Sequence, residues 1–299
     1  MSQERFEFES GGEAMVGVLH LPVDRPSAAL VTTGPLTSVK EQASGAYAAA
    51  MAVRGFATLA FDHRYFGESH GRPRQFESPA AKIDDIRAAV SALAQDERTR
   101  DLPLAAVGVC AGGGYMARAV AEEPALSAFA GVAGVYTDAA QTRMWFGDAY
   151  DTMIERARDA EQRFAETGEE DTIPAVAPDG GDVAMPLREA YEFYGTSRGA
   201  VPNYVNGFAI QSHAYTLPFD AQVAAETIEV PTLIVHSERA LSPDLAHAFF
   251  AKLEARKAEL WLDSQGQIDF YDDPALIGPA ADGIARFFTE ALGLPEAQV

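Results

Sequence analysis

The sequence predicts an α/β fold whose centre is a doubly wound, mostly parallel sheet. Short apolar segments typical of β-strands alternate along most of the chain with segments of helical periodicity. The strand segments are almost continuously apolar, which is expected when helices cover both faces of a parallel sheet. The 299 residues are enough to bury a large core, either as one large domain or as a core with a smaller second unit.

The first half of the chain supplies most of these elements. Strands are expected at the apolar runs over residues 15–20, 28–33, 56–61, 104–109 and 129–135. Helices are expected over residues 47–54, 82–95 and 112–121. Gly55 ends the first helix at a position where glycine is favoured. The second helix has apolar residues at helical spacing, namely Ile83, Ile86, Val90 and Leu93.

The same alternation returns near the end of the chain. Strands are expected over residues 232–236 and 259–262, and a last helix over 281–292. Between the two strands, Ser242-Pro243-Asp244 is typical of a helix start. The residues that line one face of this helix are Leu245, Phe249 and Leu253.

The alternation is interrupted between residues 138 and 229. Aromatic residues crowd there, and residues 151–166 have the composition of a charged helix. Long insertions between core elements are often functional, so we expect residues 138–229 to form a helical cap over a pocket. The core then consists of residues 1–137 and 230–299. The alternative is a long helical excursion that packs elsewhere.

The charge balance restricts the partners. The chain has 44 acidic and 23 basic residues, which gives a net charge of −21. Such a surface repels phosphate backbones and anionic lipids. We therefore expect a small-molecule substrate, no nucleic acid and no membrane as partners, and leave a homodimer open.

The composition also bears on compartment and cofactors. The single cysteine excludes an internal disulfide, and residues 1–13 lack the apolar segment of a signal peptide. No apolar run approaches the roughly 18 residues of a membrane helix, so we expect a cytoplasmic protein. No His/Cys/Asp cluster has metal-ligand spacing, and the glycine-rich segment lacks a P-loop lysine. We expect no metal and no cofactor.

Residues 108–115, GVCAGGGY, have the layout of a nucleophile elbow. A predicted strand leads into Gly-x-Cys-x-Gly, and a predicted helix follows. Gly108 and Gly112 provide the small residues that a sharp turn around Cys110 requires. The helix N-terminus is expected to lower the pKa of the Cys110 thiol below the usual value of about 8.5. The alternative is a passive buried thiol.

With this elbow, the chain resembles the α/β-hydrolase superfamily, specifically dienelactone-hydrolase-like members whose elbow carries cysteine. The resemblance extends over both parts of the core but little of the cap. It includes Gly34 with Lys40-Glu41-Gln42, Asp62-His63-Arg64 with Phe66-Gly67-Glu68-Ser69, Val235-His236-Ser237-Glu238, and Asp269-Phe270-Tyr271-Asp272. It implies an α/β-hydrolase fold, a triad of nucleophile, acid and histidine, and an oxyanion hole.

Three positions depart from that family pattern. Ala240 stands where the family places the acid, and Gln267 stands where it places the histidine. An amide forms hydrogen bonds but cannot shuttle a proton near neutral pH. Pro35 has no N–H to offer to an oxyanion hole, so the donors are expected from Leu36 and Ala111. Hydrolysis by the family's usual route is therefore doubtful.

A histidine from the cap is the candidate substitute base. His213 lies at the end of the cap, next to Tyr215, and the cap can bring a side chain over the elbow. The alternative is that His213 only lines the pocket or faces solvent. Tyr215 and Trp145 are expected to line the substrate pocket.

Two classes of function follow. The first is a hydrolase-like enzyme in which Cys110 acts on an acyl, lactone or thioester group, with Gln267 and His213 as further catalytic candidates. The second is a homologue that does not hydrolyse: a lyase, an isomerase, a cyclase, or a ligand-binding protein that has kept the pocket.

Overall fold

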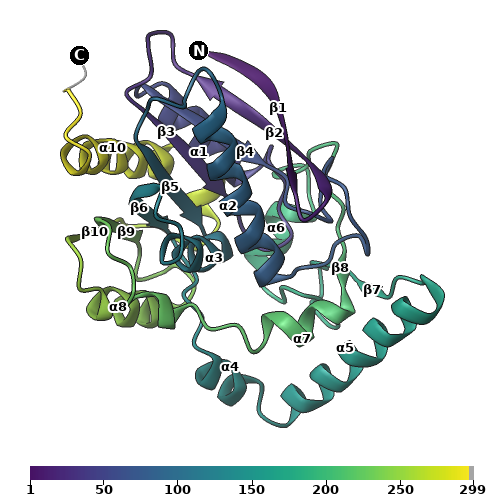
Figure 1. Cartoon of the computed structure of the whole chain (residues 1–299). Helices are drawn as coiled ribbons and strands as arrows, with labels where there is room; N and C mark the ends of the chain where they lie inside the picture. Colours follow the sequence, from purple (N-terminus) through teal and green to yellow (C-terminus); the bar gives the residue numbers. More distant parts are fainter. Residues whose placement is uncertain (296–299) are drawn as a thin grey trace.

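The computed structural model describes residues 1–295 and contains one large sheet with helices on both faces (Figure 1). Its strands are β1 (Ser2–Ser10), β2 (Glu13–Leu21), β3 (Ala28–Thr33), β4 (Phe56–Phe61), β5 (Leu104–Val109), β6 (Leu126–Val132), β9 (Thr232–His236) and β10 (Lys257–Trp261). Their order in the sheet is β1-β2-β4-β3-β5-β6-β9-β10. Pairing is antiparallel at β1–β2 and β2–β4 and parallel throughout the rest of the sheet. The predicted fold class is confirmed.

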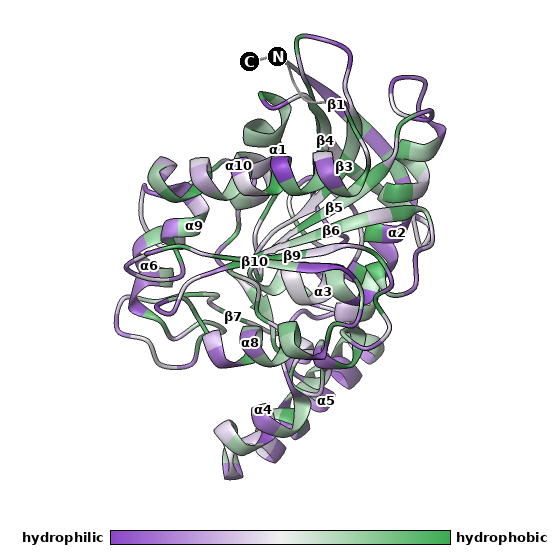
Figure 2. Ribbon diagram, turned by 90° about the vertical axis from the view of Figure 1, so that its left-hand side faces the viewer, coloured by the Kyte–Doolittle hydropathy of each residue, from purple (hydrophilic) through white to green (hydrophobic). Residues whose placement is uncertain are grey.

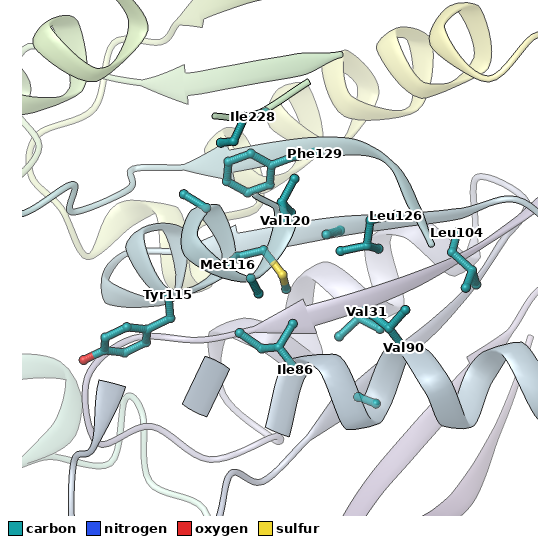
Figure 3. Close-up of a cluster of buried hydrophobic side chains, with 14 of the residues drawn as sticks. Val31, Ile86, Val90, Leu104, Tyr115, Met116, Val120, Leu126, Phe129 and Ile228 are labelled. Atoms are coloured by element: carbon teal, nitrogen blue, oxygen red, sulfur yellow. The ribbon is translucent and has the colours of Figure 1, made fainter. Parts of the chain in front are cut away.

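Two groups of helices cover the two faces of this sheet. One buried cluster joins the sheet to α2 (Pro79–Gln95), α3 (Ala111–Val120) and α8 (Pro243–Lys252). The other joins it to α1 (Ala43–Ala52), α9 (Asp269–Asp272) and α10 (Pro274–Ala291), and α1 and α10 lie side by side in Figures 1 and 2. Figure 3 shows the first cluster, where Ile86 and Val90 of α2 face Met116 of α3. The apolar strands are therefore buried from both sides, as their composition predicts.

The edges of the sheet differ from the prediction. β1 was not predicted, because charged residues alternate there with Phe6 and Phe8 and only one side of the strand faces the core. It forms an antiparallel hairpin with β2 through Gly11 and Gly12, both at positive φ.

The helix α10 begins seven residues before the predicted 281, at Pro274, where the Asp273 side chain accepts a hydrogen bond from the Ala275 N–H (2.8 Å).

The segment between β6 and β9 contains four α-helices and one short two-stranded ribbon. These are α4 (Ala139–Phe146), α5 (Asp148–Thr167), α6 (Arg188–Tyr194), α7 (His213–Thr216), β7 (Thr172–Ile173) and β8 (Phe208–Ala209). Figures 1 and 2 show α4 and α5 projecting beyond the body of the molecule. The division into a core and a cap over residues 138–229 stays a prediction, and these elements are consistent with it.

The parallel strands bring the candidate site residues to one edge of the sheet. Leu36 follows β3, Cys110 follows β5, Ala240 follows β9 and Gln267 follows β10. The carboxyl ends of parallel strands are where open α/β sheets bind ligands. The topology thus gathers residues that are far apart in the sequence.

Candidate active site

Cys110 occupies a strained turn between β5 and α3. Its φ of 57° and ψ of −125° are rare for a residue with a side chain. The Cys110 N–H donates to the Val132 carbonyl (3.0 Å), and the Cys110 carbonyl accepts from Gly113 (2.8 Å) and Val135 (2.9 Å). These bonds stabilise the turn against its strain. The predicted strand-to-helix elbow is confirmed.

Two glycines make this turn sterically possible. A Cβ on Gly108 would lie 2.5 Å from the Gly112 carbonyl oxygen. A Cβ on Gly112 would lie 2.6 Å from the Gly34 oxygen and 2.8 Å from the Thr33 oxygen. The elbow therefore needs glycine at both positions because backbone occupies the space that a side chain would fill.

The Cys110 sulfur is buried and surrounded by four donor groups. Burial raises the pKa of the thiol above its ordinary value. The Tyr271 hydroxyl, the Ala111 N–H, the Gln267 amide and the Leu36 N–H each act in the opposite direction through hydrogen bonding. The expected lowering of this pKa is wrong in direction, because the loss of solvent around a side chain that is 7% exposed outweighs the donors.

The predicted oxyanion donors both lie at the sulfur. Leu36 contributes its backbone N–H from the loop after β3, and Ala111 contributes its N–H as the first residue of α3. The Pro35 carbonyl accepts hydrogen bonds from the N–H (3.2 Å) and the hydroxyl (2.8 Å) of Ser38. Pro35 thus turns the loop so that the next residue supplies the donor.

Gln267 and Ala240 occupy neighbouring loops, as a histidine and an acid of a triad would. The Gln267 Oε1 accepts a hydrogen bond from the N–H of Leu241, the residue after Ala240 (2.9 Å). The Gln267 Nε2 donates to the Ala133 carbonyl (2.8 Å) and lies 3.4 Å from the Tyr271 hydroxyl oxygen. Since Oε1 is held by a backbone N–H, the amide has one orientation, with its NH₂ group toward Tyr271 and Cys110.

Tyr271 is a site residue that the sequence reasoning did not single out. It lies in the short helix α9, four residues after Gln267, and its hydroxyl oxygen is 3.4 Å from the Gln267 Nε2. Because the Gln267 amide donates to the Tyr271 oxygen, the hydroxyl hydrogen of Tyr271 is free for the Cys110 sulfur. The spacing of four residues was the signal available in the sequence.

Cys110 opens onto a cavity of about 360 Å³ with mainly apolar walls. The core contributes Leu36, Ala111, Tyr115, Val135, Leu241, Gln267, Ile268 and Tyr271, among others. The 138–229 segment contributes Trp145, Phe146, Ala184, Met185, Pro186, Leu187, Glu189, Ala190, Tyr194 and Phe219, among others. Trp145 therefore lines the cavity as predicted.

Two predicted residues lie elsewhere. His213 does not line the cavity: it is 8% exposed, its ring lies 5.0 Å from that of Phe208, and burial together with the charge of Arg156 lowers its pKa to about 4. Tyr215 is also outside the cavity, with its hydroxyl donating to Glu161. The structure does not bring His213 to Cys110, because α7 packs that side chain toward α5. None of the six histidines, all within the described part of the chain, lines the cavity.

Over residues 1–295, no group of three or more His, Cys, Asp or Glu side chains is arranged to hold a metal ion. Over the same residues, no helix combines the length and the apolar character needed to cross a bilayer.

Comparison with known proteins identifies the family. Residues 23–163 match the family model described as serine aminopeptidase, S33. The chain is 32% identical to the uncharacterized protein PA2218 of Pseudomonas aeruginosa, over 94% of this chain and 78% of that protein. The chain belongs to the α/β-hydrolase superfamily. The crystal structure of PA2218 superposes with a TM-score of 0.85 over 97% of this chain and 94% of the other.

Further similarities place this α/β hydrolase more broadly. It is 29% identical to the uncharacterized protein YcjY of Escherichia coli, over 88% of this chain and 89% of that protein. A dienelactone hydrolase from Anabaena variabilis shares the fold, with a TM-score of 0.58 and 13% identity over 97% of each chain. The predicted resemblance to the superfamily is confirmed, and the protein is a hydrolase-like enzyme by family. The matched model is named for serine, whereas this α/β hydrolase has Cys110 at its elbow.

Proposed function

We propose that this α/β hydrolase is an acyl-transfer enzyme whose nucleophile is Cys110. The observation that carries the proposal is the position of the sulfur, on a strained elbow that faces a cavity, with two backbone donors beside it. A carbonyl attacked by this sulfur would place its developing negative charge near the N–H groups of Leu36 and Ala111. Such preorganised donors are usually the largest contribution to catalysis of acyl transfer.

The cavity supports a small, mainly apolar acyl, lactone or thioester substrate. A volume of about 360 Å³ is in the range of small-molecule sites, and most of its lining side chains are apolar. The apolar part of such a substrate would pack against Phe146, Met185 and Leu187 of the 138–229 segment. The reacting carbonyl would then lie at the core side, over Cys110.

In the first step, the Cys110 sulfur bonds to the carbonyl carbon and the bond from that carbon to the leaving group breaks. The Tyr271 hydroxyl donates to the sulfur and favours its anionic form before attack. The proton of the thiol leaves with the departing alcohol or thiol. The Gln267 amide positions Tyr271 for this role and does not exchange protons itself.

The second step is where this enzyme departs from its family. Hydrolysis of an acyl-cysteine requires a base to activate water, and no histidine of the described chain lines the cavity. We therefore propose that acylation of Cys110 is faster than its hydrolysis, so that the acyl-enzyme accumulates.

Intact-protein mass spectrometry tests this proposal. After mixing with p-nitrophenyl acetate, one acetyl group per chain is expected within the burst of p-nitrophenol, followed by slow turnover. Cys110→Ala is expected to give neither adduct nor burst. A wild-type enzyme that turns over without any adduct on Cys110 would overturn the proposal.

A second candidate function is favoured by the absence of a histidine from the described cavity wall. The apolar walls keep water away from the acyl group, so a nucleophile within the substrate itself would compete well with water. This supports a cyclase, lyase or isomerase, or a protein that binds its ligand without hydrolysing it. Product analysis by mass distinguishes these from hydrolysis, because only hydrolysis adds the mass of water.

A further inference from the structure

The cavity beside Cys110 has a single carboxylate on its wall. Among the described residues that line the cavity, Glu189 is the only acidic one, and none is a lysine, an arginine or a histidine. Glu189 is the second residue of α6, and its side chain is half-buried. A charge that has lost part of its hydration against apolar walls needs a partner that compensates for this loss.

The protein supplies partners for one of the two oxygens of this carboxylate. Oε2 accepts hydrogen bonds from the backbone N–H groups of Gln267 (3.1 Å) and Ile268 (3.4 Å). Gly266 makes this approach possible, because a Cβ there would overlap Oε2. The Gln267 amide is itself hydrogen-bonded to the Cys110 sulfur. The carboxylate is therefore anchored to a residue that contacts the nucleophile.

The second oxygen, Oε1, is left without a partner in the described part of the chain. Both protein hydrogen bonds to this carboxylate end on Oε2, and Oε1 is not among the unpaired side-chain atoms that are closed to solvent. Within residues 1–295, no cation pairs with Glu189, and the adjacent Arg188 is bound to Glu192 (2.9 Å). A carboxylate oxygen can only accept hydrogen bonds, so a matching ligand must donate one, and a cationic donor binds most strongly.

We propose that Glu189 selects substrates by charge and that its Oε1 binds an ammonium group of the substrate. The preferred substrates are then acyl compounds that carry an amino group. Compounds that carry a carboxylate are rejected, because they would bring two negative charges together in one apolar cavity. This inference rests on the proposed function of Cys110, since it places the reacting carbonyl over that sulfur.

The test uses three thiol reagents that differ in charge. They are 2-aminoethyl methanethiosulfonate (cationic), 2-sulfonatoethyl methanethiosulfonate (anionic) and methyl methanethiosulfonate (neutral). Each forms a disulfide with Cys110 and releases methanesulfinate, and the rate is followed by intact mass without any acyl transfer. The ratio of the cationic to the anionic rate is expected to fall about ten-fold from wild type to Glu189→Gln, because a unit charge beside the sulfur is lost.

The glutamine at position 189 separates the charge from a structural role. Its amide oxygen can still accept from the N–H groups of Gln267 and Ile268, so the loop keeps its anchor. If Glu189→Gln slows all three reagents by the same factor, the carboxylate serves only to support this loop, and the inference is overturned.

Glu192→Gln is the matched control. Glu192 lies on the same helix and carries the same charge, but it does not line the cavity. Its replacement is expected to keep the wild-type ratio of rates. If Glu192→Gln lowers the ratio as much as Glu189→Gln does, the selection comes from the net charge of −21 and not from the cavity, which would contradict the inference.

Protection of Cys110 tests the same claim on the wild type. Hexylammonium, hexan-1-ol and hexanoate share one chain length, and each is added before methyl methanethiosulfonate. Hexylammonium is expected to slow the modification of Cys110 most and hexanoate least, whereas equal protection by all three would overturn the inference. If charge selection is observed but p-nitrophenyl acetate leaves no adduct on Cys110, the proposed function fails and the subsite stands. Acylation of Cys110 without charge selection gives the reverse result.

Discussion

At the scale of single residues, the proposed mechanism depends on the side chain at position 267. A histidine there would take a proton from the nucleophile and return it to the leaving group. The Gln267 amide accepts a hydrogen bond from the Leu241 N–H and donates one to the Ala133 carbonyl. It also donates to the Tyr271 hydroxyl oxygen, which orients the Tyr271 hydroxyl hydrogen toward the sulfur. The result is a donor beside the sulfur instead of a base, which favours a thiolate but does not activate water.

Tyr271→Phe tests the donor directly. The variant is expected to shift the pH profile of Cys110 alkylation by iodoacetamide upward by about one unit, because a hydrogen bond to the anionic sulfur is lost. The wild-type midpoint is itself expected above about 8.5, since burial raises the pKa of the thiol. Tyr47→Phe, which removes a buried hydroxyl on α1 outside the cavity, serves as the control. If the pH profile of alkylation is unchanged in Tyr271→Phe, the Tyr271 hydroxyl does not donate a hydrogen bond to the Cys110 sulfur.

Rebuilding the triad tests the two departures together. Ala240→Asp with Gln267→His is expected to raise steady-state hydrolysis of p-nitrophenyl acetate about ten-fold or more, because an oriented imidazole then activates water. Either substitution alone is expected to do little, since the imidazole and the carboxylate each lack their partner. Adding Cys110→Ala to the double variant should abolish the gain. If the wild type and a folded double variant hydrolyse p-nitrophenyl acetate at equal rates, positions 240 and 267 are not those of the family's acid and histidine.

At the scale of elements, the elbow and the 138–229 segment differ in how they are specified. The elbow is specified by a few neighbouring residues. Gly108 and Gly112 leave room for adjacent backbone, and Cys110 adopts a strained conformation with positive φ. The conformation of the 138–229 segment depends mainly on contacts between residues that are distant in the sequence. Its helix α7 turns His213 toward Arg156 and Asp182 of the same segment, where the imidazole is buried away from the nucleophile.

The burial of His213 predicts a loss of stability in acid. Its pKa is about 4 in the folded protein and about 6.5 when exposed, so the unfolded chain binds more protons between these values. The free energy of unfolding therefore falls as the pH drops from 6.5 toward 4. Urea titrations at pH 7.5 and pH 5.0 should show His213→Gln losing about 2 kcal/mol less than wild type over this interval. His70→Gln, at an exposed position, is the control and should lose as much unfolding free energy between the two pH values as wild type. If His213→Gln also loses as much as wild type, the His213 imidazole is not buried.

At the scale of the whole molecule, Glu77 joins segments that are distant in the sequence. Its carboxylate is fully buried and binds the Lys82 ammonium (2.6 Å), the Tyr115 hydroxyl (2.9 Å) and the Thr37 N–H (3.2 Å). Its own N–H donates to the Ser212 hydroxyl (2.9 Å). One residue thus connects the loop after β3, the helices α2 and α3, and the 138–229 segment, directly behind the cavity.

Removing one charge of this pair should be more harmful than removing both. Lys82→Met leaves the Glu77 carboxylate buried without its cation, and we expect it to lower the free energy of unfolding by about 3–5 kcal/mol. Glu77→Gln combined with Lys82→Met is expected to recover part of that loss, because no charge then remains buried. Denaturant titration of the wild type, Glu77→Gln, Lys82→Met and the double variant measures the coupling, and losses that add in the double variant would contradict it.

The sequence by itself determined most strands and helices of the core, β1 excepted, and the position of the elbow. Apolar runs such as 104–109, helical spacing such as that of Ile83, Ile86 and Val90, and glycines around Cys110 act over a few residues. Their effect depends on local sterics and periodicity, so they can be recognised without knowing the fold. Leu36 and Ala111 were predictable as donors for the same reason, because Pro35 has no N–H and the helix start presents one.

Only the tertiary structure decided what surrounds the sulfur. Tyr271 of α9 and Tyr194 of α6 line the cavity together with Cys110, whereas the packing of α7 buries His213 away from it. The direction of the pKa shift of Cys110 was decided in the same way, since burial depends on every segment that closes over the thiol. Contacts between distant segments depend on how loops turn and how the 138–229 segment docks, and no short stretch of sequence contains that information.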